Sequence, residues 1–290
     1  MRPAPRRVTV SAGEYELVYD PSVGEAEPWY VNDHTFVRDR VGVWHLIGIT
    51  HAEPMAAHDE KHFAHATAPT LHGPWTKRPF ALTADPDAAE THLWAPHVVV
   101  HDDRYWMFYC GGGIDETAYR IQLAVSDDCW TWTRHRANPL VVDGFHARDP
   151  MVVRIGERWV LYYTATTAPA GGQFVVKAVE SDDLLTWAAP RIVYTDARAG
   201  TFGGTTESPF VVARDGHYYL FIGPDWGMNG TSYRTTRVLA SDDPFHFEAS
   251  GRVGTIASHA AEVVVDDGTW WVSHCGWSMG GVYLAPLHWE

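Results

Sequence analysis

Short apolar runs recur along the chain, and each is bounded by Gly, Asp or Pro. One pattern appears five times: an apolar run, a tight turn, and a second run rich in aromatic residues. The first runs begin near residues 33, 95, 149, 208 and 261, so the copies are 62, 54, 59 and 53 residues apart. Runs of this length joined by turns such as Arg214-Asp215-Gly216-His217 or Asp266-Asp267-Gly268 are typical of β-hairpins.

A third run follows in each copy and leads to a second shared turn. The sequence Ser-Asp-Asp opens this turn at residues 126–128, 181–183 and 241–243, and Trp132, Trp187 or Phe247 stands shortly beyond it. Asp and Ser side chains bond to their own backbone in such turns, and the aromatic residue predicts the start of a fourth strand. Four strands repeated five times predict an all-β protein, a five-bladed β-propeller with four-stranded antiparallel blades.

The two ends of the chain fit this reading. The fifth copy has room for three strands before residue 290, and spare strand-like segments lie at residues 7–10 and 15–18. We expect one of them to complete the fifth blade, so that an N-terminal strand closes the ring and removes an exposed edge. Residues 1–290 are therefore predicted to form a single propeller domain, with about 58 residues to a blade.

Charge and composition exclude several classes of function. The 22 basic and 36 acidic residues give a net charge of −14, which disfavours a nucleic-acid partner. The three cysteines form no Cys-x-x-Cys pair, so no zinc or redox motif is present. Because no apolar stretch is long enough to span a membrane and no signal peptide is visible, we expect no membrane partner and a cytoplasmic location.

The residues just before each first strand carry the candidate chemistry. In a propeller the innermost strands line a central channel, so these segments face one funnel. Asp33, Asp149 and Glu207 stand there in three different copies, and Glu262 follows one step further along in the fifth. Since like charges held close together cannot all ionise easily, at least one of these acids should have a raised pKa.

Paired carboxylates suit the cleavage of a glycosidic bond. One acid protonates the leaving oxygen, while another activates water or attacks the sugar. Trp94, Trp226 and Trp277 lie close to the predicted funnel and can stack on the apolar face of a sugar. The sequence therefore predicts a glycosidase with a small carbohydrate as its partner.

The motifs Asn32-Asp33, Trp94-Ala95-Pro96, Arg148-Asp149-Pro150 and Glu207-Ser208-Pro209, one per blade, resemble those of five-bladed propeller glycoside hydrolases. The chain is most similar to family 43 and its relatives, and families 32 and 68 share the Asn-Asp, Arg-Asp-Pro and Glu elements. The resemblance covers nearly the whole chain. One departure is Asp33-His34, where family 43 usually has Asp-Pro.

The resemblance implies roles for the three acids. Asp33 would be the general base or nucleophile, Asp149 would orient the site and tune its pKa values, and Glu207 would be the general acid. Family 43 members invert configuration and typically cleave arabinofuranosides, xylosides or galactosides. Families 32 and 68 retain configuration and act on fructosides. The implied substrate is a small or terminal sugar, a furanoside of arabinose or fructose type or a xyloside.

Other polar residues around the funnel are candidates for binding the substrate. His34 and Glu262 add titratable groups, His51 is expected to meet a sugar hydroxyl or to lie at the rim, and Arg148 is expected to hold Asp149 charged or bind the substrate. No cofactor is expected to be required. In some family 43 relatives, a His in the register of His259 helps to hold a channel calcium ion, mainly through water, so calcium is one alternative there and a plain hydrogen-bonding role is the other.

Three functions compete on this evidence. The first is a hydrolase acting on a glycoside. The second is a transglycosidase or another non-hydrolytic enzyme on the same propeller, and the third is a carbohydrate-binding propeller without catalysis. Binding propellers repeat one site in every blade, whereas the five blades here carry different residues at the funnel. This asymmetry favours one composite central site.

Overall fold

The computed structural model describes residues 8–168, 171–197, 205–224 and 233–290. These residues form strands and four short 3₁₀ helices, with no α-helix among them. The 3₁₀ helices are η1 (Ala57–Asp59), η2 (Pro86–Ala88), η3 (Glu116–Ala118) and η4 (Ala249–Gly251). Within the described part of the chain, no helix is long and apolar enough to cross a membrane. The predicted all-β class is confirmed.

Three separate four-stranded antiparallel sheets follow one another along the chain. The first contains β3 (Trp29–Arg38), β4 (Trp44–Ala52), β5 (His62–Ala68) and β6 (Thr76–Thr83). The second contains β7 (His92–His101), β8 (Arg104–Gly112), β9 (Arg120–Ser126) and β10 (Thr133–Arg134). The third contains β11 (Arg148–Ile155), β12 (Arg158–Ala168), β13 (Gly171–Ser181) and β14 (Arg191–Thr195). Each sheet corresponds to one predicted repeat.

The remaining strands belong to one nine-stranded sheet, in which the N-terminal strands join the two ends of the chain. Its first part is β15 (Glu207–Arg214), β16 (His217–Gly223), β17 (Thr236–Ser241) and β18 (Arg252–Ile256). Its second part is β19 (Val263–Asp266), β20 (Thr269–His274), β21 (Val282–Trp289), β1 (Val10–Ala12) and β2 (Glu16–Tyr19). Both β1 and β2 pair with β21, and β1 also pairs with β18 in parallel. The predicted closure by an N-terminal strand is therefore seen, and both candidate segments take part.

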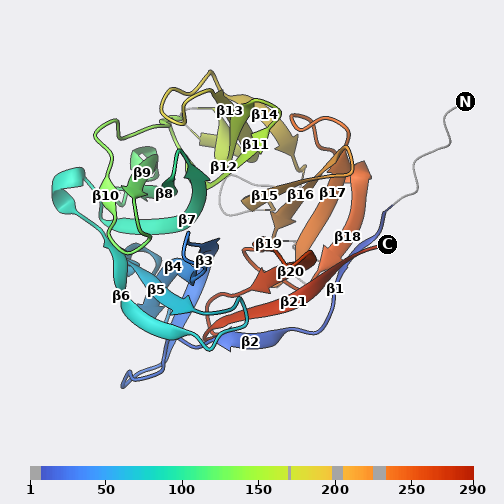
Figure 1. Cartoon of the computed structure of the whole chain (residues 1–290). Helices are drawn as coiled ribbons and strands as arrows, with labels where there is room; N and C mark the ends of the chain where they lie inside the picture. The colour runs from blue at the N-terminus through green and yellow to red at the C-terminus, as the bar shows by residue number, and fades with distance from the viewer. Residues whose placement is uncertain (1–7, 169–170, 198–204, 225–232) are drawn as a thin grey trace, which may run out of the picture.

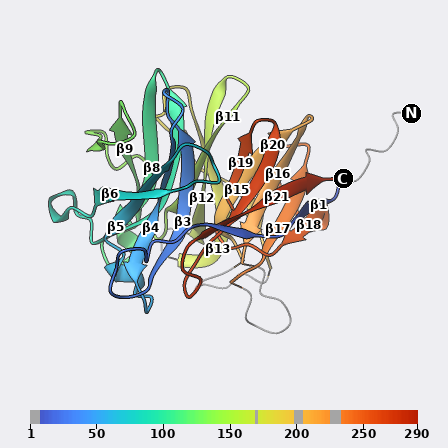
Figure 2. The same cartoon turned by 60° about the horizontal axis from the view of Figure 1, so that its bottom comes forward.

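The sheets stand around a common centre, with β3, β7, β11, β15 and β19 innermost (Figures 1 and 2). This radial arrangement is that of a β-propeller. The core lies between neighbouring sheets: one buried cluster, for example, joins Phe108 of β8 to Leu161 of β12. Burial of such apolar faces against each other supplies the main stabilisation of the ring.

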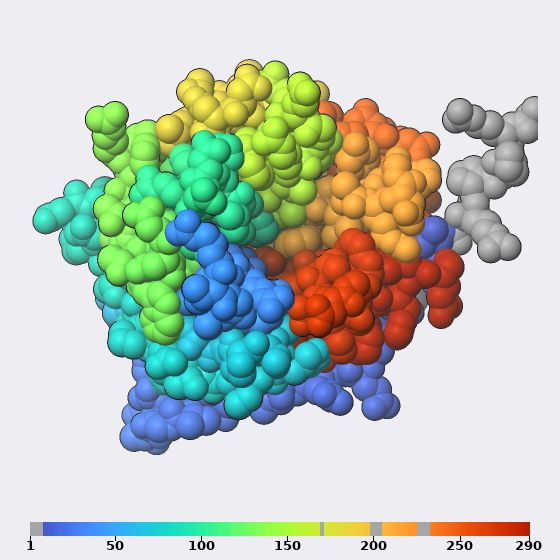
Figure 3. All heavy atoms as spheres, viewed as in Figure 1, coloured from blue at the N-terminus to red at the C-terminus, as the bar shows by residue number. Residues whose placement is uncertain are grey.

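The two turn types predicted from the sequence are both present. Asp215 and Gly216 have φ of 52° and 81°, and Asp267 and Gly268 have 47° and 78°, as a type I′ hairpin turn requires. In the second turn type, the Oδ1 atom of Asp183 accepts hydrogen bonds from the backbone N–H groups of the two residues that follow Leu184. The hairpin turns gather around the centre on one face (Figure 3).

The opposite ends of the innermost strands carry a repeated irregularity. Register shifts occur in β3 between Val31 and His34, and at the matching place in β7, β11 and β15. Ala95, Asp149 and Ser208 lie at these bulges with φ of 48°, 55° and 48°. A bulge bends its strand and re-aims a side chain. The fold thus turns one residue per unit towards the centre, at the end remote from the hairpin turns.

Candidate active site

Two cavities adjoin each other in the centre of the ring, and Asp33, Asp149 and Ser208 line both. The cavity that we call the upper one measures about 90 Å³. Besides those three residues, it is lined by Asn32, Ile49, Ala57, Glu60, Trp94, Arg148, Glu207, Tyr233, His259 and Trp277. The lower cavity measures about 30 Å³, which is room for about two water molecules. Only the upper one is of interest as a sugar site.

The three predicted acids converge on the upper cavity, each from a different sheet. Asp33 comes from β3, Asp149 from β11 and Glu207 from β15. Their side chains are 15%, 8% and 8% exposed, so all three carboxyl groups are largely removed from water. The spacing of the repeats predicted this convergence, and the bulges described above produce it.

Gly48 on β4 makes the bulge at Asp33 possible. Gly48 is paired with His34 across the two strands. A Cβ atom on Gly48 would lie 2.6 Å from the Cβ of His34 and 2.9 Å from Cγ1 of Val31. Real Cβ atoms do not come that close to other heavy atoms. A larger residue at position 48 would therefore displace the strand that presents Asp33.

Arg148 links two of the acids. Its Nη2 donates a hydrogen bond to Oε1 of Glu207 at 2.9 Å, and its Nη1 lies 3.5 Å from Oδ2 of Asp149. Burial disfavours the guanidinium charge, but the two carboxylates outweigh it and raise the pKa of Arg148 above its ordinary value. The arginine is therefore a fixed positive charge between two acids.

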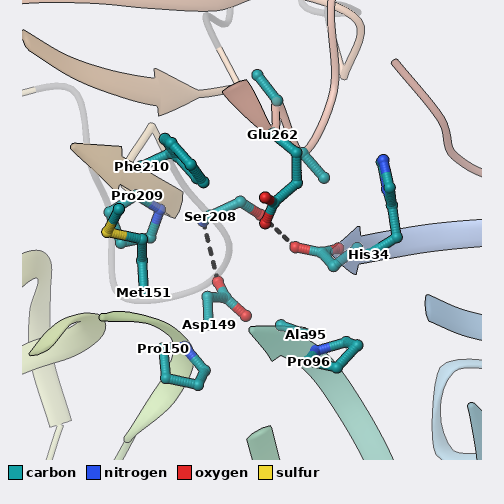
Figure 4. Close-up of a pocket in the computed structure, with 13 residues that line it drawn as sticks. His34, Ala95, Pro96, Asp149, Pro150, Met151, Ser208, Pro209, Phe210 and Glu262 are labelled. Carbon is teal, nitrogen blue, oxygen red and sulfur yellow. Dashed lines mark hydrogen bonds between the residues drawn. The ribbon is translucent and has the colours of Figure 1, made fainter. Parts of the chain in front are cut away.

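Ser208 bridges the other pair of acids, as the dashed lines in Figure 4 show. Its hydroxyl donates to Oδ1 of Asp33 at 2.6 Å, and its backbone N–H donates to Oδ2 of Asp149 at 3.1 Å. Thr164 donates a further hydroxyl to Oδ2 of Asp149 at 2.9 Å. Asp149 is thus held by three donors, including Arg148, whereas Ser208 is the one side chain of the described residues that donates to Asp33, which lines the cavity.

Asp33 is the acid with the strongest perturbation. Burial, together with the negative charge of Asp149, raises the pKa of Asp33 to about 7, although the hydroxyl of Ser208 opposes the shift. An isolated aspartate titrates near pH 4. One proton is therefore available inside this cluster of carboxyl groups near neutral pH, as the crowding of acids predicted.

Tyr233 is a site residue that the sequence did not reveal. Its hydroxyl donates to Oε2 of Glu207 at 3.1 Å, and its ring lies 4.8 Å from the ring of Trp277. Burial and the charge of Glu207 raise the pKa of Tyr233 above its ordinary value, so it stays protonated and acts as a donor. Nothing in the sequence around residue 233 distinguishes this tyrosine from the others.

Glu60 is a second residue that the sequence did not single out. It follows η1 in the loop after β4, is 1% exposed and lines the upper cavity. Oε1 of Glu60 accepts hydrogen bonds from the Tyr30 hydroxyl at 2.7 Å and from Nε1 of Trp277 at 3.2 Å. Burial raises its pKa to about 7, against the effect of these donors. In sequence, Glu60 resembles the neighbouring exposed acid Asp59.

The other predicted binding residues divide between several places. Trp94, Arg148, Trp277 and His259 line the upper cavity as expected. His34 and Glu262 line the lower cavity instead, where Figure 4 shows Glu262 beside Ser208. His51 lines neither, because its ring packs against Trp29 and Tyr30 and its Nδ1 bonds to the carbonyl of Ala52. Trp226 lies outside the described residues.

The surroundings of His259 bear on the calcium alternative. Among the residues that the structure describes, no group of three or more His, Cys, Asp or Glu side chains is placed to hold a metal ion. The Nε2 of His259 lies 3.9 Å from Oδ2 of Asp33, and its ring packs 4.3 Å from that of Tyr233. Calcium takes six to eight oxygen ligands, and water can supply several of them. Calcium at His259 and a plain hydrogen-bonding role therefore both stay predictions.

Comparison with known proteins gives a consistent picture. The model of the glycosyl hydrolases family 32 N-terminal domain matches residues 26–252. A probable sucrose-6-phosphate hydrolase of Psychromonas ingrahamii is 28% identical over 58% of this chain. The chain spans 31% of the length of that relative. The resemblance inferred from the motifs placed family 43 first and family 32 second, whereas the matching family model is that of family 32.

Solved structures of both families share the fold. A family 32 β-fructofuranosidase of Bombyx mori superposes with a TM-score of 0.71 at 18% identity, over 95% of this chain and 61% of that chain. A family 43 β-xylosidase/α-arabinofuranosidase from a compost microbial metagenome superposes with a TM-score of 0.66 at 14% identity, over 96% of this chain and 94% of that one. At these identities the likeness concerns the fold.

Proposed function

This chain belongs to the family of glycosyl hydrolase family 32 N-terminal domains, and on that premise we propose that it is a glycosidase acting in the upper cavity. One observation carries the proposal: Asp33, Asp149 and Glu207, from three separate sheets, line one buried cavity together with Trp94 and Trp277. Acids from several strands meeting beside aromatic rings suit the cleavage of a glycosidic bond.

We propose the following roles for the acids. Glu207 donates a proton to the leaving oxygen, and Asp33 acts from the other side of the bond, as a base on water or as a nucleophile on the sugar. In this scheme Asp149 contacts neither the leaving oxygen nor the water or sugar on which Asp33 acts. Its charge raises the pKa of Asp33, and with Ser208 and Arg148 it fixes the positions of the other two acids.

One shared proton connects these roles. Asp33 is the group that holds a proton near neutral pH, while Arg148 and Tyr233 both donate hydrogen bonds to Glu207. The productive form has that proton on Glu207 and Asp33 ionised. We therefore propose that one proton is shared between the two acids, and that the productive form is the one with the proton on Glu207.

The names of the relatives and the small volume of the cavity support a proposal on the substrate class. The relatives are described as a sucrose-6-phosphate hydrolase, a β-fructofuranosidase and a β-xylosidase/α-arabinofuranosidase. We propose that this chain takes a small or terminal furanoside or xyloside. Trp94 and Trp277 both line the cavity and can contact the sugar ring.

We also propose that residues 1–290 form one unit of five blades. Three four-stranded sheets and the two parts of the nine-stranded sheet support this count. In this reading β15 to β18 form the fourth blade, and β19 to β21 with β2 form the fifth. The strand β1 then couples the last two blades through its pairing with β18 and β21.

The test is a panel of sucrose, arabino-oligosaccharides and 4-nitrophenyl furanosides and xylosides, with NMR of the first-formed product. Hydrolysis of at least one member, lost in Asp33→Asn, supports the proposal. Transfer of the sugar to another sugar instead of water would show a transglycosidase. Binding of a panel sugar without any turnover would show a lectin-like propeller and refute the proposal.

A further inference from the structure

The upper cavity carries a fourth acid. Besides the three acids already described, it is lined by Glu60, which is carried by the loop between β4 and β5. The roles proposed above do not use Glu60. A buried carboxyl group that faces a ligand cavity is costly to retain unless its polar atoms are used.

The contacts of Glu60 leave one of its oxygens available. Both described hydrogen bonds, from Tyr30 and Trp277, end on Oε1. The indole of Trp94 also lies close enough to this carboxyl group to lower its pKa, although its Nε1 donates to the carbonyl of Ala57. Tyr30 and Trp277 therefore fix the orientation of the carboxyl group, and the remaining oxygen can accept a hydrogen bond from a ligand.

Two indole rings lie beside Glu60 in the lining of the cavity. The indole of Trp277 donates to Glu60, and the indole of Trp94 donates to the carbonyl of Ala57 at 3.1 Å, in the same loop. A sugar ring offers an apolar face to such indoles and hydroxyl donors at its edge. A carboxylate fixed between two indoles suits the edge hydroxyls of a bound sugar.

The charges of the cavity bear on the kind of sugar. Asp33, Glu60, Asp149 and Glu207 are acids, and Arg148 is the one Lys or Arg side chain among the described lining residues. Its guanidinium already contacts two of the acids, Asp149 and Glu207. A phosphate group placed in this cavity would thus meet the carboxyl groups of four acids and no uncommitted cation from these lining residues.

We propose that Glu60 is a specificity-determining residue of this cavity, which accepts hydrogen bonds from the hydroxyl groups of an uncharged sugar ring and disfavours a phosphorylated one. This inference rests on the proposed glycosidase function and adds a substrate class to it. It separates this chain from the activity for which its sucrose-6-phosphate hydrolase relative is named.

The first arm of the test measures kcat and KM for the best uncharged substrate of the panel. Glu60→Gln keeps the shape of the side chain but weakens its acceptor, so we expect KM to rise about 10- to 100-fold with kcat changed less than threefold. Glu53→Gln is the matched control. Glu53 lies in the same loop and accepts the backbone N–H of Ser278 at 2.6 Å, but it does not line the cavity. The KM of the Glu53→Gln variant should stay within threefold of that of the wild type.

The second arm compares sucrose 6-phosphate with that uncharged substrate in the wild type. We expect kcat/KM for the phosphorylated sugar to be at most one-tenth of the value for the uncharged one. Equal or better turnover of sucrose 6-phosphate, or an unchanged KM in Glu60→Gln, would overturn the inference while leaving the glycosidase standing. Absence of turnover of every sugar by the wild type would instead refute the proposed function.

A structural role for Glu60 predicts a different result. If it served only to hold Trp277 and Tyr30, then Tyr30→Phe, which removes one of these bonds but keeps the carboxylate, would raise KM as much as Glu60→Gln does. We expect a rise of less than fivefold in Tyr30→Phe. Melting temperatures of all the variants show whether each one is folded. An equal rise in KM for the two variants would refute direct contact with the sugar.

Discussion

The hydroxyl of Ser208 gives the sharpest test of the proton-sharing scheme. It donates to the carboxylate of Asp33 at 2.6 Å and lowers the pKa of that carboxyl group, which burial and Asp149 raise to about 7. Ser208→Ala removes this donor alone, because the backbone N–H to Asp149 remains. The backbone tolerates the change, since Ala95 and Ala260 already adopt φ of 48° and 47°, close to the 48° of Ser208.

The size of the effect follows from the bond. A hydrogen bond to a charged group contributes about 1.5–3 kcal/mol, and a shift of one pKa unit corresponds to about 1.4 kcal/mol. Losing the bond should therefore raise the pKa of Asp33 by about 1 to 2 units. In the free enzyme the last shared proton then leaves near pH 8 to 9 instead of near 7.

The assay is the pH dependence of kcat/KM, which reports the ionisation of the free enzyme. The wild type should lose activity above about pH 7, as the shared proton leaves. In Ser208→Ala this alkaline limb should move up by about 1 to 2 units. The plateau should fall about 10- to 100-fold, because Asp33 keeps the proton that Glu207 needs.

Two outcomes would refute this reasoning. An alkaline limb that stays in place or moves down would show that Ser208 does not stabilise the ionised form of Asp33. A limb that moves up with an unchanged plateau would show that Asp33 itself is the acid. Ser181→Ala is the control, because it removes a serine–aspartate bond in a remote turn. Its profile should match that of the wild type.

Further predictions concern the other partners of the acids. Arg148→Met leaves Asp149 and Glu207 buried without their cation, so the free energy of unfolding in urea should fall by about 3 kcal/mol; a change below about 1 kcal/mol would show that the ion pairs contribute little. Asp33→Asn should raise the melting temperature at pH 8 while abolishing activity. The folded state raises the pKa of Asp33, so ionisation destabilises the fold as pH rises from about 4 towards 7. The gain should therefore be small at pH 4, and an equal gain at both pH values would contradict the assignment.

Much of the fold was predictable because it repeats. Five copies of the hairpin and three copies of the Ser-Asp-Asp turn set the strand order, and Asp215-Gly216 adopts the hairpin turn that its sequence favours. The three acids were predictable for the same reason, since equivalent positions in repeated units face one centre. The choice between the two N-terminal segments was not predictable, because each of them is short and both pair with β21.

The rest of the site depends on contacts that no local pattern encodes. Glu60 and Tyr233 reach the cavity from loops, and what distinguishes them is their partners, Trp277 and Glu207, which are far away in the sequence. His34 follows Asp33 directly, and successive residues of a strand point to opposite sides. The bulge between Val31 and His34 interrupts this alternation, so both residues line the lower cavity and Asp33 also lines the upper one.

The central claim is that Glu207 supplies the proton and Asp33 acts on the sugar or on water. The most direct test is to compare kcat/KM for a 4-nitrophenyl glycoside, whose leaving group needs no proton, with kcat/KM for an oligosaccharide of the same sugar. We predict that Glu207→Gln loses at least 100-fold on the oligosaccharide but less than tenfold on the aryl glycoside, whereas Asp33→Asn loses activity on both. Equal losses on the two substrates in Glu207→Gln, or full activity of either variant on the oligosaccharide, would contradict the claim.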